Sequence, residues 1–129
     1  MDEVALTSLT ARLLERTDIK PWIFYSDAPD GKADGLTRLG ATVVRVGRRV
    51  DGLDLREVLR ILHERGSTSL MVEGGARVLG AFLHFGLATQ VIVTKSPSKM
   101  AGLAGPGIPR FSVSESERFG EDTVIWGLP

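Results

Sequence analysis

The sequence predicts a single α/β domain over residues 1–129, built around a mostly parallel sheet. Short apolar runs rich in β-forming residues alternate along the chain with stretches in which apolar residues recur at helical spacing. Strands and helices that alternate in this way favour parallel βαβ units with right-handed crossovers. Because the expected strands are almost entirely apolar, helices should cover both faces of the sheet. The length of 129 residues suits one compact domain.

The first half of the chain predicts two strands and two helices. Strands are expected at residues 22–25 and 42–46, with a short helix between them that stops at Gly40. The second helix is the clearest, because apolar residues fall at i, i+3, i+4 and i+7 from Leu55. Asp54 can cap it, with Glu57 placed as a capping box requires. Gly40 and Gly66 are the expected ends of the first and second helices, and Gly86 is the expected end of a later one.

The second half repeats the alternation and then changes character. A third strand is expected at residues 69–72, and a fourth at 90–94. Between them, Val78, Leu79, Phe82 and Leu83 repeat the helical spacing, so a helix is expected there. Residues 96–110 are rich in glycine and proline and should form a loop. A polar link then leads to a last strand at 122–126, expected to be antiparallel at an edge of the sheet.

Composition excludes several classes of function. Cysteine is absent, so there is no disulfide framework, no thiolate metal site and no cysteine nucleophile. The 16 basic and 16 acidic residues cancel, which gives no global attraction to nucleic acid or to an anionic membrane. No apolar run approaches the roughly 20 residues that span a bilayer, and the acidic start is unlike a secretory signal. We therefore expect a cytoplasmic protein with no nucleic-acid or membrane partner.

The residues of most chemical interest lie between the third predicted strand and the next helix. Two glycines, Gly74 and Gly75, open that helix, and glycine lets the main chain approach a ligand closely because it has no Cβ. Helix N-termini leave amides unpaired and carry partial positive charge, so they stabilise anions such as a pyrophosphate. In open α/β sheets, ligands also bind beyond the carboxyl ends of the strands. The sequence thus contains a candidate phosphate-binding turn.

Purely structural interpretations compete with a binding role. By spacing alone, Gly74-Gly75 is more typical of a tight strand-to-helix connection, because a glycine pair is a weak signal. Glu73 favours binding, since a carboxylate at the end of a buried strand needs a hydrogen-bond partner such as a ribose hydroxyl. Glu73 is equally suited to capping the helix that follows.

The stretch from Ser69 to Leu87, which contains Val-Glu-Gly-Gly-Ala, closely resembles the hallmark of the reductase domain of riboflavin biosynthesis. That domain is the C-terminal half of the bacterial bifunctional deaminase–reductase, and it also occurs as a separate enzyme in fungi and archaea. The resemblance covers about residues 11–125. It implies a dihydrofolate-reductase-like fold with three α/β/α layers, a mostly parallel central sheet and an antiparallel C-terminal edge strand, incomplete at its N-terminus.

The resemblance also implies an activity. The family reduces the ribosyl group of a pyrimidine-ribosylamino 5′-phosphate to the ribityl form, and NADPH supplies the hydride. The Gly74-Gly75-Ala76 turn would hold the cofactor pyrophosphate, and Glu73 would be the catalytic residue that faces the nicotinamide or the substrate ribose. Ser26, after the first strand, would lie near the adenosine end of the cofactor.

Further expectations concern the loop and the assembly. Gly102 lies in the glycine-rich loop that would close over the site in the family. Family members are generally dimers, and a truncated sheet exposes its edges, so we expect a homodimer or self-association.

This sequence departs from the family pattern at two places. The Ser-Leu-Asp-Gly strand and the substrate-pocket segment with which the family begins are not in it. Thr89-Gln90 stands where the family typically has Asp-Glu. The first departure leaves a second hypothesis open, a catalytically impaired or non-catalytic nucleotide-binding remnant that needs a missing segment or a partner. An unrelated α/β module for another nucleotide is a third.

Other polar residues give weaker signals. His63 and His84 have no ligand partner at metal-binding spacing, so we expect no metal site. Arg48-Arg49 could meet a cofactor 2′-phosphate, but a solvated turn is the favoured interpretation.

Overall fold

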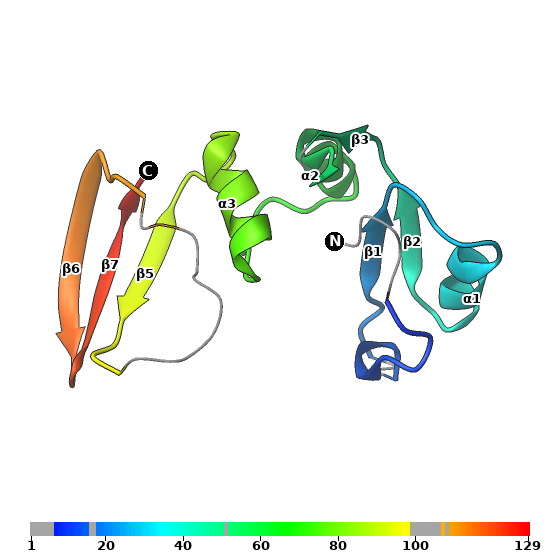
Figure 1. The fold of residues 1–129 in the computed structure, drawn as a ribbon, viewed down its shortest axis with the longest axis horizontal. Coiled ribbons are helices and arrows are strands. Elements are labelled where there is room, and N and C mark those ends of the chain that lie inside the picture. Colours follow the sequence, from blue (N-terminus) through cyan, green and yellow to red (C-terminus); the bar gives the residue numbers. More distant parts are fainter. Residues whose placement is uncertain (1–6, 16–17, 51, 99–106, 108) are drawn as a thin grey trace. The chain divides into compact units, whose positions relative to one another are not determined.

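A computed structural model describes residues 7–15, 18–50, 52–98, 107 and 109–129 of the chain. The chain divides into two compact units, Met1–Ser69 and Leu70–Pro129. The elements in chain order are η1 (Arg12–Leu14), β1 (Trp22–Tyr25), α1 (Lys32–Arg38), β2 (Thr42–Arg45), β3 (Arg48–Arg49), β4 (Gly52–Leu53), α2 (Leu55–Glu64), α3 (Ala76–His84), β5 (Val91–Lys95), β6 (Val113–Phe119) and β7 (Asp122–Leu128). Figure 1 labels all of them except η1 and β4. The molecule is therefore a mixed α/β protein with small sheets.

The first unit is built around a parallel βαβ motif, as the alternation of the sequence predicts. Strands β1 and β2 pair in parallel, and the pairing ends with Tyr25 opposite Arg45. Helix α1 connects them, and Gly31 precedes it with φ 73°. Gly40 has φ 90° and stands where the helix was expected to stop.

The core of this unit lies on both faces of the parallel pair. Neighbouring residues of a strand point to opposite faces. Ile23 packs with Leu36 of α1, whose side chain is fully buried, whereas Phe24 packs with Val58 of α2. Helices α1 and α2 thus cover opposite faces of β1 and β2.

Helix α2 begins as its sequence predicts. The carboxylate of Asp54 accepts hydrogen bonds from the amides of Arg56 (3.1 Å) and Glu57 (3.3 Å). The second half of the expected capping box is absent, because Glu57 Oε2 instead accepts from the amide of Gly47 at 2.7 Å. This bond ties the end of the β2 segment to α2.

Arg48 and Arg49 were expected in a solvated turn, but they belong to a short hairpin. These two exposed residues form β3, which pairs antiparallel with β4. Arg49 Nε donates to Asp54 Oδ2 at 2.7 Å, so this arginine serves the helix cap. The hydrogen bond from Arg49, aided by the two helix amides, lowers the pKa of Asp54 below its usual value of 3.8.

Replacing Asp54 with alanine should lower the free energy of unfolding by roughly 1–2 kcal/mol at neutral pH, since an N-cap and an ion pair are lost together. Because the folded-state pKa is lowered, the carboxylate stabilises the fold above its unfolded-state pKa, and this contribution disappears as pH falls through the folded value. The free energies of unfolding of wild type and variant, measured with urea, should therefore converge only as pH falls below 3.8 and through the lowered folded-state pKa of Asp54. An undiminished difference at low pH would assign the loss to packing instead.

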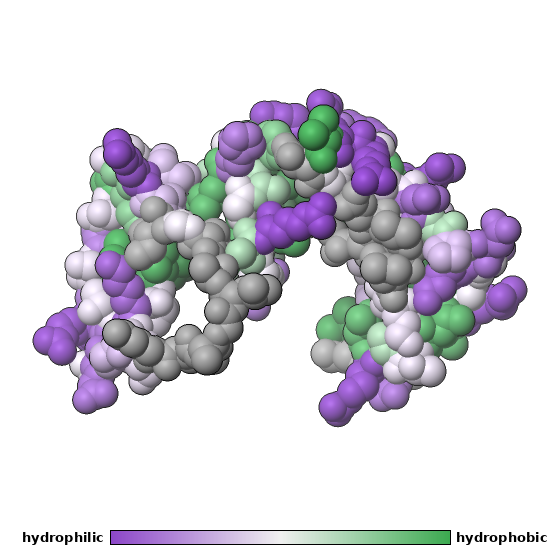
Figure 2. Space-filling view, in the orientation of Figure 1, coloured by the Kyte–Doolittle hydropathy of each residue, from purple (hydrophilic) through white to green (hydrophobic). Residues whose placement is uncertain are grey.

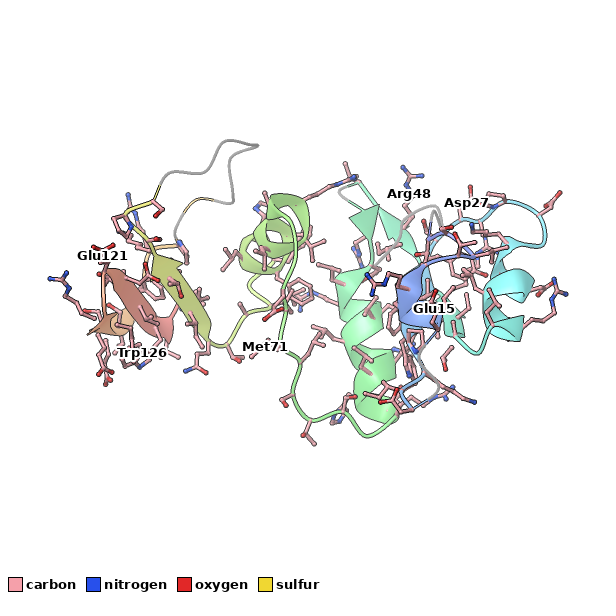
Figure 3. All side chains as sticks on the ribbon, turned by 90° about the horizontal axis from the view of Figure 1, so that it is seen from below. Glu15, Asp27, Arg48, Met71, Glu121 and Trp126 are labelled. Carbon is pink, nitrogen blue, oxygen red and sulfur yellow. The ribbon has the colours of Figure 1, made fainter. Side chains whose placement is uncertain are left out.

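The third predicted strand, residues 69–72, is not a strand. No described residue hydrogen-bonds to its main chain, and Leu70 and Met71 are 48% and 78% exposed. Figure 3 labels Met71 on this extended segment between α2 and α3. A strand exists only where a neighbour accepts and donates hydrogen bonds. The apolar run is therefore extended but unpaired among the described residues.

The second unit contains an antiparallel sheet in the order β5-β7-β6. The fourth and last predicted strands are present as β5 and β7, and they pair antiparallel. The expectation that the last strand lies at an edge is wrong, because β6 covers its other side. The presumed polar link is in fact β6, joined to β7 by a tight turn at Gly120 (φ 62°). Strand β6 is exposed along its whole length.

Several apolar side chains of the second unit are exposed. Ile92, Val113 and Phe119 are among them, and Figure 2 shows apolar atoms among polar ones over strands β5 to β7. Within the described part of the chain, none of the helices has the length and apolar character that a membrane crossing requires.

Candidate functional site

The turn at residues 73–76 leads directly into helix α3. Gly75 is the N-cap residue, with φ −71° and ψ 166°, and no side chain caps the helix. Its carbonyl accepts from the amides of Val78 and Leu79, as the first turn of a helix requires. The amides of Gly74, Gly75 and Ala76 donate to no described residue. They are the unpaired donors that make a helix N-terminus attractive to an anion.

The space in front of these amides is open. A Cβ built on Gly75 would meet no atom within 4 Å, and one on Gly74 would touch only Val78 at an ordinary 3.7 Å. The φ of Gly75 is accessible to any residue, so the backbone conformation does not require a glycine here. Absence of a side chain keeps the amides uncovered, which is the property that a phosphate-binding turn needs.

Glu73 lies beside this turn with an exposed side chain. The capping role considered for Glu73 is wrong, because α3 has no side-chain cap. Burial does not require Glu73 to have a hydrogen-bond partner, as the sequence suggested, because the preceding segment is neither buried nor paired among the described residues. Glu73 is thus an accessible carboxylate next to open amides.

Ser26 belongs to the first unit, whereas residues 73–76 belong to the second. It directly follows β1, and it is 8% exposed. Its carbonyl oxygen accepts a hydrogen bond from Arg45 Nε at 3.1 Å. This hydrogen bond between Ser26 and Arg45 joins the carboxyl ends of the two parallel strands. Open α/β sheets bind ligands in that region.

An open pocket of about 230 Å³ lies at the same end of the strands. Tyr25 and Arg45, the last residues of β1 and β2, line it together with the loop that leads to α1. Figure 3 labels Asp27 on that loop. Ser26 is not among the residues that line this pocket, so its predicted place near the adenosine end of a cofactor stays a prediction. Arg45 was not predicted as a site residue, although it lies one residue before the end of the second predicted strand.

Two further expectations concerned Gly102 and a metal site. Gly102 lies outside the described residues, so its role in a closing loop stays a prediction. In the described ranges no group of three or more histidine, cysteine, aspartate or glutamate side chains is arranged to hold a metal ion.

Each unit offers a place of its own to a polar ligand. In the second unit, unpaired amides and an uncovered turn suit an anion such as a diphosphate. In the first unit, Tyr25 and Arg45 both line the open pocket. When bound, the nicotinamide of NADPH would supply a hydride, whereas the protein would contribute binding, alignment and electrostatics.

Comparison with known proteins gives a consistent picture. The family model of the RibD C-terminal domain matches residues 2–125. The riboflavin biosynthesis protein RibD of Bacillus amyloliquefaciens is 29% identical over 133 residues, covering 93% of this chain and 35% of the relative. The RibD protein of Aquifex aeolicus is 32% identical over 127 residues, covering 92% of this chain and 34% of the relative. The chain spans about a third of the length of these relatives. The resemblance noted from residues 69–87 is confirmed, and the chain belongs to the RibD C-terminal domain family.

Proposed function

We propose that this chain acts in riboflavin biosynthesis as an NADPH-dependent reductase. The reaction reduces the ribosyl group of a pyrimidine-ribosylamino 5′-phosphate to the ribityl form. Family membership over residues 2–125 supports the reaction class. The single structural observation that carries the proposal is the open turn, where the Gly75 position leaves free space in front of unpaired amides.

Each residue of the proposed site has a physical task. The amides of Gly74, Gly75 and Ala76 bind the cofactor diphosphate through charge-assisted hydrogen bonds. Ser26 lies at the adenosine end of the cofactor. Glu73 is the proposed catalytic residue, and its accessible carboxylate accepts a hydrogen bond from a hydroxyl of the substrate ribose. Reduction by hydride transfer requires alignment more than an acid–base pair, so this small set of residues suffices.

The two units are proposed to be parts of one dihydrofolate-reductase-like domain with three α/β/α layers. The coverage of opposite faces of β1 and β2 by α1 and α2 supports such layers locally. The unpaired run at residues 69–72 has the composition of a strand of the central sheet. The protein is also proposed to form a homodimer, because unpaired edges and exposed apolar residues on β5 and β6 favour self-association.

Thermal unfolding with added nucleotides tests this proposal. A ligand that binds the folded state stabilises it, by about 2.7 kcal/mol at a hundredfold excess over its Kd. We expect NADPH to raise the melting temperature and ATP at the same concentration to leave it unchanged. Incubation with the pyrimidine substrate should then convert NADPH to NADP⁺ and add two hydrogen atoms to the substrate, detected by mass spectrometry.

The possible outcomes separate the hypotheses. Binding with turnover supports the reductase. NADPH binding without turnover would identify the non-catalytic nucleotide-binding remnant. A melting temperature raised by ATP but not by NADPH would overturn the proposal in favour of another nucleotide-binding module.

A further inference from the structure

We draw no further inference here: the strongest candidate, the exposed apolar patch on the face of the β5-β7-β6 sheet that carries Ile92, Val113 and Phe119, is an unpartnered surface, and nothing among the residues that the structure describes shows what covers it.

Discussion

Replacing Gly127 with valine should destabilise the β5-β7-β6 sheet by roughly 3 kcal/mol or more, a large effect for one position. Gly127 lies in the central strand β7, opposite Val91 of β5 and Ser114 of β6. A Cβ at this position would collide with the carbonyl oxygen of Val113 and lie 2.8 Å from the Cα of Ser114. These are main-chain atoms, so they can move away only if the pairing of β6 with β7 is disturbed.

Trp126 provides the measurement for this prediction. It is adjacent to Gly127, and the other tryptophan, Trp22, belongs to the first unit. In a Trp22→Phe background, fluorescence during urea unfolding should report the second unit alone. Gly80→Ala is the matched control, because a Cβ there meets no atom within 4 Å and alanine favours the helix. An unfolding midpoint of Gly127→Val equal to that of the control would refute the close approach of β6.

Gly75→Val should reduce NADPH affinity at least tenfold without loss of the fold. The φ of −71° at Gly75 is open to valine, and the added atoms meet open space rather than protein. Those atoms would instead occupy the volume in front of the unpaired amides and keep a diphosphate away. Thermal shift with NADPH measures the effect, because the stabilisation by a ligand depends on its affinity.

A graded series strengthens this prediction. Gly75→Ala adds one carbon and should lie between wild type and Gly75→Val, whereas Gly80→Ala in the same helix should bind NADPH as wild type does. Equal stabilisation of Gly75→Val and wild type by NADPH would remove the turn from the cofactor site.

Local sequence patterns predicted those elements whose stabilising contacts are also local. Helix α2 formed with its expected cap because Asp54, Arg56 and Glu57 are neighbours in the chain. The glycine ends of the helices follow from backbone conformation alone. The βαβ motif was predictable because α1 joins β1 and β2 through short connections.

The errors concern strands, whose partners are distant in the sequence. Residues 69–72 have strand composition, but no described strand pairs with them. Strand β6 was missed because Ser-Glu-Ser-Glu-Arg lacks the apolar alternation that indicates a half-buried strand, and it is exposed throughout. Its pairing with β7 depends on the turn at Gly120 rather than on burial.

The candidate site was predictable to a similar extent. The open amides before α3 could be inferred because a helix N-terminus and its glycines are contiguous. The hydrogen bond between Arg45 and Ser26 could not be inferred, because the two residues are 19 positions apart in the sequence. Only the register of β1 with β2 brings them together.

Amide NMR of the ¹⁵N-labelled protein during an NADPH titration tests the central claim most directly. If main-chain N–H groups before α3 bind the diphosphate, the signals of Gly74, Gly75 and Ala76 should shift in a saturable manner, as the formation of new hydrogen bonds requires. Signals from these three amides that stay fixed while NADPH saturates the protein would contradict the account.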